Sequence, residues 1–283
     1  DGLAATGDRR LSLGSGRSGM ELRALGSTGL RVSPLGLGTV KFGRNRGVKY
    51  PQSFELPSDR EALTLLELAW DLGMNLLDTA PAYGESEERL GRLLRRCRRD
   101  WVIVTKVGEE FQDGESRFDF SAAATRASVE RSLRRLGVEA LDAVLIHSSG
   151  DDLHILEREG VLPVLLDLQR AGWVRSIGMS TKTVAGGLRV LECCDVVMLT
   201  YNLSEREEWQ VIQAARAAGK GVLIKKGLRS GHLDRTAGID PVRASMELIF
   251  AEPGVSSVVV GTLNPAHLRA NVVVAESVLN QHG

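Results

Sequence analysis

The feature that most limits the fold of this chain is a regular alternation of short apolar runs with amphipathic helical segments. Between the runs, apolar residues recur with the 3.6-residue period of a helix that buries one face. Strands that read as continuous apolar runs are buried on both faces, as parallel strands covered by helices must be. The alternation therefore predicts an α/β fold with eight parallel strands. The runs cover residues 35–39, 74–78, 101–107, 141–147, 173–179, 195–201, 221–226 and 255–261.

Local signals predict where several of the intervening helices begin and end. A capping box, in which two side chains satisfy free backbone N–H groups, is expected at Ser58 with Glu61 and at Ser204 with Glu207. About eight helices are thus expected between and after the strands. The other signals are capping residues before a proline at Asp240 and Asn264, and helix-ending glycines at Gly73, Gly137, Gly172 and Gly219.

The glycine spacing after the first strand separates two possible architectures, an open doubly wound sheet and a closed barrel. An open dinucleotide-binding sheet would place GxGxxG there, whereas residues 36–43 read GLGTVKFG. Eight strand and helix units in 283 residues also fit one barrel, which needs roughly 250 residues. We therefore predict a (β/α)8 TIM barrel.

The segment before the first strand is expected to form two separate parts. Two short apolar runs flank the turn sequence at residues 26–29, which predicts an N-terminal β-hairpin that closes the bottom of the barrel. Residues 1–19 are rich in Gly, Ser and Arg and are expected to be a flexible extension or a cloning remnant. The single barrel domain is accordingly predicted to cover residues 20–283.

Charge and composition exclude some classes of partner. The 36 basic and 36 acidic residues cancel, so no overall field favours nucleic acid or an anionic membrane. No run of 18 apolar residues is present, and the three cysteines lack zinc or CxxC spacing. These features predict a cytoplasmic protein, with monomer and homo-oligomer both open.

Four polar residues at or near the ends of three successive strands are the candidate catalytic residues. Asp78 ends one apolar run, Tyr83 follows five residues later, Lys106 lies late in the next run and His147 ends the third. Barrel enzymes carry their chemistry at the C-terminal ends of the strands. Each residue taken alone is more often a cap, a packing residue or a satisfied structural group, so the ordered combination carries the prediction.

The chemistry of these side chains suggests how they act together. A lysine on the buried strand would be costly without an anion, and Asp78 on the preceding strand is the natural partner of Lys106. The ion pair would keep Lys106 charged, and a positive charge beside the Tyr83 phenol is expected to lower its pKa from about 10. Tyr83 is then a candidate general acid near neutral pH.

Five segments in order resemble the aldo-keto reductase family, from about Leu22 to the last helix. LLDTAPAYGESEERLGRLL resembles the family segment with its Asp and Tyr, VIVTKVG the lysine strand and DAVLIHS the histidine strand. RSIGMST resembles the strand that holds the nicotinamide carboxamide, and VVVGTLNPAHLRANV the end that binds phosphate and adenine. The resemblance implies a catalytic tetrad of Asp78, Tyr83, Lys106 and His147.

The resemblance also implies an activity and a cofactor. Hydride would pass from NADPH, with NADH possible, to an aldehyde or ketone while Tyr83 protonates the oxygen and His147 orients it; no metal is needed. The cofactor-binding residues that the resemblance implies are Thr39, Ser180, Thr181, Lys226, Leu228, Gly231, Gly261, Thr262, Asn264, His267 and Asn271.

The chain departs from the family pattern where the cofactor is expected. Thr181 stands where family members commonly have Asn, and Met198 where they commonly have Gln. Lys225 stands where an aromatic often stacks on the nicotinamide ring, and Lys226 begins the stretch that is usually Ser-Pro-Leu. Residues 261–268 contain no Arg or Lys that could bind the 2′-phosphate of NADPH. The preference for NADPH over NADH is therefore implied mainly by the resemblance to the family.

Substrate contacts and rival functions complete the expectations. The segments 43–56 and 109–120 are the expected substrate walls. The alternatives are an NAD(P)-dependent aldose dehydrogenase that uses the same residues and a non-catalytic subunit that senses NADPH. A metal-dependent hydrolase is disfavoured, because the five histidines show neither HxH nor HExxH spacing. The expected apolar substrate contacts are Phe42, Tyr50, Phe54 and Phe111.

Overall fold

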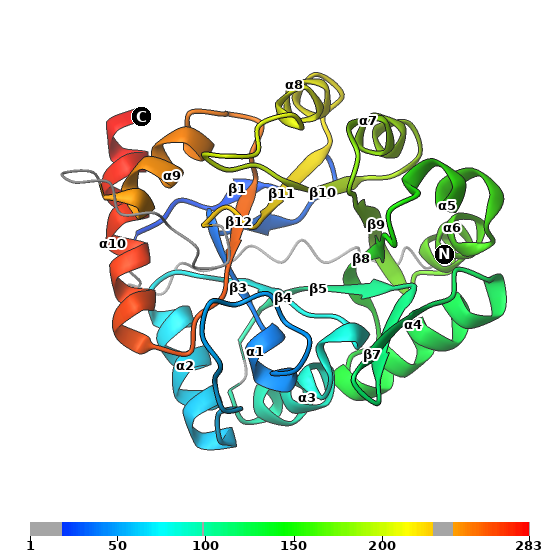
Figure 1. Ribbon diagram of the computed structural model, residues 1–283, viewed down its shortest axis with the longest axis horizontal. Helices are drawn as coiled ribbons and strands as arrows, with labels where there is room; N and C mark the ends of the chain where they lie inside the picture. Colours follow the sequence, from blue (N-terminus) through cyan, green and yellow to red (C-terminus); the bar gives the residue numbers. More distant parts are fainter. Residues whose placement is uncertain (1–18, 98, 229–239, 283) are drawn as a thin grey trace, which may run out of the picture.

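The computed structural model describes residues 19–97, 99–228 and 240–282, and its central element is a closed barrel of eight strands. Every neighbouring pair of strands in the barrel is parallel. The predicted (β/α)8 fold is therefore confirmed, and each predicted apolar run coincides with one strand to within two residues (Figure 1). The strands are β3 (Leu35–Gly38), β4 (Leu76–Asp78), β5 (Val102–Val107), β8 (Leu141–His147), β9 (Val174–Ser180), β10 (Val196–Thr200), β11 (Gly221–Lys225) and β12 (Ser257–Val260).

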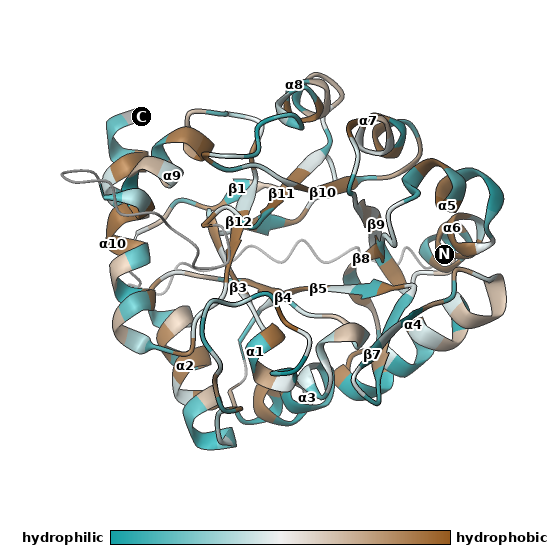
Figure 2. Cartoon of the chain, viewed as in Figure 1, coloured by the Kyte–Doolittle hydropathy of each residue, from teal (hydrophilic) through white to brown (hydrophobic). Residues whose placement is uncertain are grey.

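Helices form a ring around the barrel (Figure 1). Strand residues are largely hydrophobic, whereas the helices mix hydrophobic and hydrophilic residues, as expected for helices with one buried face (Figure 2). The helices are α2 (Asp59–Asp71), α3 (Ser86–Arg96), α4 (Ala122–Leu136), α5 (Asp152–Arg158), α6 (Val161–Arg170), α7 (Val184–Cys193), α8 (Trp209–Ala217), α9 (Pro241–Phe250) and α10 (Pro265–His282), with the short α1 (Val40–Gly43) and the 3-10 turn η1 (Pro81–Tyr83).

An N-terminal hairpin, β1 (Arg23–Ala24) with β2 (Arg31–Val32), lies at the end of the barrel where the strands begin. Its Leu25 and Val32 are buried in one cluster with inward residues such as Val104 and Leu223. The backbone N–H of Ser27 donates to the carbonyl of Gly219, just before β11. The hairpin closes the bottom of the barrel as predicted. Residues 1–18 lie outside the described residues, so the prediction for the N-terminal extension stays a prediction.

The helix signals are confirmed with one exception. Ser58 and Glu61 form the predicted capping box at the start of α2. Ser204 and Glu207 do not, because α8 begins only at Trp209. The N–H groups of Ser204 and Glu205 instead donate to the side chain of Asn202, which forms a turn there. The prolines after Asp240 and Asn264 begin α9 and α10, and the four predicted helix-ending glycines, Gly73, Gly137, Gly172 and Gly219, all have positive φ.

A second hairpin, β6 (Glu109–Gln112) with β7 (Glu115–Phe118), interrupts the segment between β5 and α4. We expected residues 109–120 to form a substrate wall and predicted no hairpin there. The Asp113-Gly114 turn has positive φ at both residues, the geometry that tight hairpin turns require. β7 is exposed throughout and β6 is only half-buried, so the hairpin depends on the turn and not on a buried apolar face.

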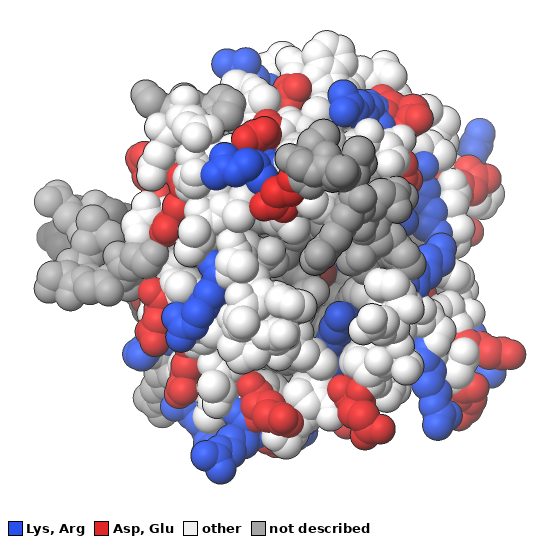
Figure 3. All heavy atoms as spheres, turned by 60° about the vertical axis from the view of Figure 1, so that its left-hand side comes forward, with Lys and Arg blue, Asp and Glu red and all other residues white. Residues whose placement is uncertain are grey.

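The surface carries charges of both signs. On the face shown in Figure 3, basic and acidic side chains are interspersed, so this face has no field of a single sign. No helix within the described residues combines the length and the apolar composition that crossing a membrane requires.

Candidate active site

A cavity of about 740 Å³ opens at the C-terminal ends of the barrel strands. This size lies within the range of small-molecule sites, and this end of the barrel is where such enzymes hold their reacting groups. Asp78, Tyr83, Lys106 and His147 all line it. The structure thus brings the four predicted catalytic residues together in one cavity.

Asp78 forms hydrogen bonds with both Lys106 and Tyr83. The Lys106 ammonium donates to Asp78 Oδ1 at 2.6 Å and to the carbonyl of Thr79 at 2.9 Å. The Tyr83 hydroxyl donates to Asp78 Oδ2 at 3.3 Å. Lys106 Nζ lies 4.7 Å from the centre of the Tyr83 ring. The predicted ion pair between Lys106 and Asp78 is present.

The expected direction of the Tyr83 pKa shift is wrong. Burial raises the pKa of the Tyr83 phenol well above 10, and the negative charge of Asp78 raises it further. The reasoning from sequence placed the ammonium beside the hydroxyl, whereas the hydroxyl contacts the carboxylate. A phenolate there would face an anion in a poorly solvated place, so the phenol stays protonated.

Backbone packing positions Tyr83. Gly84, the next residue, has φ of 61°, and a Cβ on it would lie 2.1 Å from the Gly43 carbonyl oxygen. A Cβ on Gly43 would in turn lie 2.3 Å from the carbonyl oxygen of Tyr83. Both contacts are possible only for glycine. The backbone at the end of α1 is therefore in direct contact with the backbone that follows η1, and this contact fixes the position of the Tyr83 backbone from which the side chain extends.

His147 has an acidic neighbour that the sequence analysis missed. Its Nδ1 lies 2.9 Å from Glu109 Oε2, at an angle unsuited to a hydrogen bond, so the contact is electrostatic. The imidazole beside it holds the pKa of Glu109 down at about 2, against the raising effect of burial. Burial lowers the pKa of His147. Glu109 begins the unpredicted hairpin, and an acidic residue three positions after Lys106 was the available signal.

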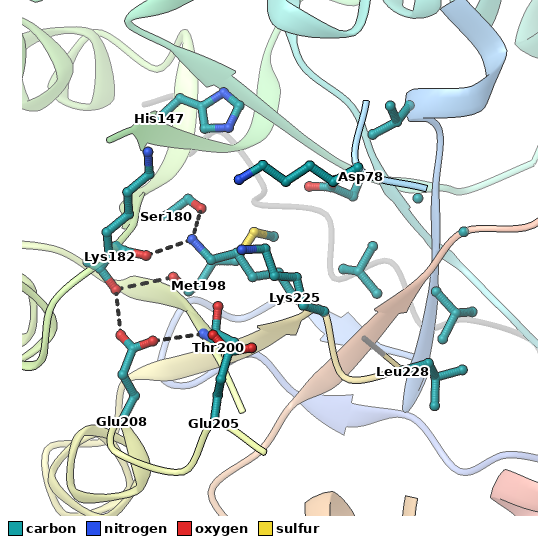
Figure 4. Close-up of a pocket in the computed structure, with 18 of the residues that line it drawn as sticks. Asp78, His147, Ser180, Lys182, Met198, Thr200, Glu205, Glu208, Lys225 and Leu228 are labelled. Carbon is teal, nitrogen blue, oxygen red and sulfur yellow. Dashed lines mark hydrogen bonds between the residues drawn. The ribbon is translucent and has the colours of Figure 1, made fainter. Parts of the chain in front are cut away.

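The side chains expected at the nicotinamide carboxamide are engaged with one another (Figure 4). Lys225 donates to Ser180 Oγ at 2.8 Å and to the carbonyl of Thr181 at 2.6 Å. Thr181 Oγ1 lies 3.2 Å from Glu208 Oε1, to which it donates. Glu208 also accepts from the N–H of Thr200, and burial raises its pKa. Met198 lines the cavity without a polar group to offer. Sequence analysis did not find Glu208.

The other residues expected to bind the cofactor are divided. Thr39 is fully buried, with its hydroxyl bonded to the carbonyl of Asp78 and to Ser86, and it does not line the cavity. Thr262, Asn264 and His267 lie near the start of α10, outside the lining of the cavity. Gly231 lies outside the described residues. The expected residues that do line the cavity are Ser180, Thr181, Lys226, Leu228, Gly261 and Asn271.

Only one of the four expected aromatic substrate contacts lines the cavity. Tyr50 does, and its ring meets Phe54 edge to face at 5.7 Å. Phe111 instead packs under the Arg44 guanidinium, 3.6 Å from the ring centre. The expectation for Phe42 is wrong, because its side chain is fully buried in the hydrophobic core, where α1 places it. A substrate cannot reach it there.

The described part of the chain contains no group of three His, Cys, Asp or Glu side chains placed to hold a metal ion.

Comparisons with known proteins agree with this geometry. The family model described as "Aldo/keto reductase family" matches residues 34–236. A crystal structure of a Pseudomonas aeruginosa protein, named as a candidate aldo-keto reductase, is 56% identical with a TM-score of 0.83, covering 91% of this chain and 95% of its own. L-galactose dehydrogenase of Arabidopsis thaliana is 30% identical over 81% of this chain and 72% of its own. Pyridoxal 4-dehydrogenase of Microbacterium luteolum is 26% identical over 89% and 92%.

Proposed function

Because this chain belongs to the aldo/keto reductase family, and is therefore an oxidoreductase, we propose that it reduces aldehydes or ketones with a nicotinamide dinucleotide. Tyr83 is the proposed proton donor. The observation that carries the proposal is the convergence of Asp78, Lys106, Tyr83 and His147 on one cavity at the C-terminal ends of the strands.

In this proposal each side chain has a task that its contacts support. Asp78 forms the ion pair that compensates the burial of the Lys106 ammonium. The raised pKa of Tyr83 keeps its phenol protonated until a carbonyl oxygen that gains negative charge takes the proton. The ammonium near the ring stabilises the phenolate that then forms. His147, whose ring lies 6.2 Å from that of Tyr83, would bind and orient the carbonyl oxygen.

The cavity fits the cofactor that the family generally uses. It reaches from the catalytic group to Leu228, Gly261 and Asn271, a span that suits an extended molecule. Ser180 would hold the carboxamide, and Lys226, Leu228, Gly261 and Asn271 would hold the phosphate and adenosine parts. Thr181 would contribute little, because its hydroxyl is already bonded to Glu208. The bound dinucleotide would supply the hydride. We propose NADPH, with NADH the alternative.

An aldose dehydrogenase is a second candidate, because hydride transfer is reversible and the same residues would serve. The similarity to L-galactose dehydrogenase supports it. Oxidation of several aldoses with NAD⁺ and NADP⁺, measured beside the reduction of an aldehyde panel, separates the two. Robust aldose oxidation without aldehyde reduction would favour the dehydrogenase.

Replacement of the proposed acid tests the reaction. We expect Tyr83→Phe to lower kcat by about a hundredfold or more, the usual contribution of a general acid. Its dissociation constants for NADPH and NADH, from nicotinamide fluorescence titration, should stay near those of the unmodified protein. Tyr201→Phe is the matched control, because Tyr201 does not line the cavity. Unchanged turnover in Tyr83→Phe would rule out its role as the acid.

A further inference from the structure

Lys225 is a second cavity lysine whose situation differs from that of Lys106. It ends β11 and reaches toward Ser180 (Figure 4). Its nitrogen donates to Ser180 Oγ and to the carbonyl of Thr181, and the residue lines the cavity. Both acceptors are neutral. Among the described residues, Lys225 forms no ion pair with a carboxylate, whereas Lys106 lies 2.6 Å from Asp78.

Burial favours the neutral form of Lys225. It is the main cause that lowers the pKa of the Lys225 ammonium to about 8, and the positive charges of Lys226 and Lys106 contribute to the shift. The negative charges of Glu208 and Asp152 oppose it. A desolvated lysine close to other cations is the arrangement that makes an amine nucleophilic near neutral pH. Lys106, by contrast, donates directly to the Asp78 carboxylate.

The hydrogen bonds leave one position on the nitrogen open. A neutral amine has two N–H groups and one lone pair, and the two acceptors match the two N–H groups. The third tetrahedral position has no partner among the described residues, and the amine lies at the wall of the cavity. An electrophile that enters the cavity can therefore meet the lone pair.

We propose that Lys225 is an amine site that captures small aldehydes as imines. The lone pair of Nζ attacks the carbonyl carbon, and the carbonyl oxygen takes a proton to give a carbinolamine. Loss of the second amine proton and of the hydroxyl as water leaves a C=N bond. Amine plus aldehyde thus becomes imine plus water, with no change of oxidation state. This activity is additional to hydride transfer and needs no cofactor.

Reductive trapping tests the proposal. The purified protein is incubated with benzaldehyde and sodium cyanoborohydride, and benzyl groups are followed by intact mass and peptide mapping. At about pH 7.5, a pKa near 8 leaves about a quarter of an amine neutral, against about a thousandth for an ordinary lysine. We expect the peptide map to show Lys225 benzylated more than about tenfold faster than surface lysines; the α-amino group, whose pKa is also near 8, is mapped and scored separately from this fast lysine phase. The rate of this fast phase should rise with pH through about 8.

Three variants separate the causes. Lys225→Arg keeps the positive charge but cannot form the imine, so the fast phase should disappear. Lys182→Met removes an exposed lysine that also lines the cavity and should keep the fast phase. Tyr83→Phe, which removes the proposed acid of hydride transfer, should keep it too. A fast phase that persists in Lys225→Arg, or a first benzyl group mapped to another lysine of the unmodified protein, would overturn the proposal. The peptide map decides the matter even if Lys225→Arg does not fold.

Discussion

Removal of the Asp78 carboxylate should cost more stability than any single surface change. The side chains of Lys106 and Asp78 are only 2% and 5% exposed. At an effective dielectric constant of about 20, charges 2.6 Å apart attract by about 6 kcal/mol. Desolvation offsets much of that attraction, so the net value of the pair is small. Asp78→Asn leaves the ammonium buried without its anion, which should cost about 3 to 5 kcal/mol.

Urea unfolding followed by circular dichroism measures this cost in a double-mutant cycle. The proteins are the unmodified chain, Asp78→Asn, Lys106→Met and the double variant. A loss of this size corresponds to a fall in Tm of about 6 to 20 °C for a chain of this length. The double variant should be less unstable than the sum of the singles by more than about 2 kcal/mol, because it leaves no unpaired charge.

A matched control and a clear refutation accompany the cycle. Asp167 pairs with Arg170 on the surface, where the two side chains are 55% and 76% exposed. Asp167→Asn should cost less than about 1 kcal/mol. The reasoning fails if the single losses at Asp78 and Lys106 add within about 0.5 kcal/mol, or if Asp78→Asn costs no more than the surface control.

Three further outcomes are expected. Ser58→Ala removes the cap of α2 and should lower the free energy of unfolding by about 1 kcal/mol in urea titration; no loss would mean that the capping box contributes nothing. In the folded protein the pKa of Glu109 is lowered to about 2, against about 4.5 in the unfolded chain. The ionised carboxylate therefore stabilises the fold fully at pH values above about 4.5, and this contribution is lost as the pH falls toward 2. Glu109→Gln should therefore lose less stability over that range, and an unchanged acid profile would contradict this. Gly84→Ala should displace Tyr83 and lower kcat about a hundredfold, a result that wild-type turnover would refute.

Local patterns were enough to predict the barrel. Each apolar run is a signal that needs no knowledge of distant residues, and every one of the eight overlaps a strand. The pairing of Lys106 with Asp78 was also predictable, because a buried ammonium must find an anion and adjacent strands place their ends together. Burial and periodicity therefore suffice for the scaffold and for its main ion pair.

What escaped prediction depends on competition between neighbours. The predicted capping box at Ser204 does not form, because the N–H groups of Ser204 and Glu205 donate to the side chain of Asn202. The direction of the Tyr83 pKa shift depends on whether the hydroxyl meets an ammonium or a carboxylate, which spacing along the chain does not determine. The hairpin of β6 and β7 has no apolar alternation, although the Asp113-Gly114 turn was a usable signal. From the sequence, Lys225 stands out only as a departure from the family pattern. Its hydrogen bond to Ser180, which ends β9, depends on the fold and not on neighbouring residues in the sequence.

The direct backbone contact between Gly43 and Gly84 has a consequence for redesign of the enzyme. No side chain can be inserted there, so these two positions offer a protein engineer nothing to vary. The hairpin of β6 and β7 is the opposite case, with exposed residues on β7 and one residue that contacts His147, Glu109, at its base. Libraries aimed at new substrates should therefore diversify the hairpin and leave the glycine contact untouched.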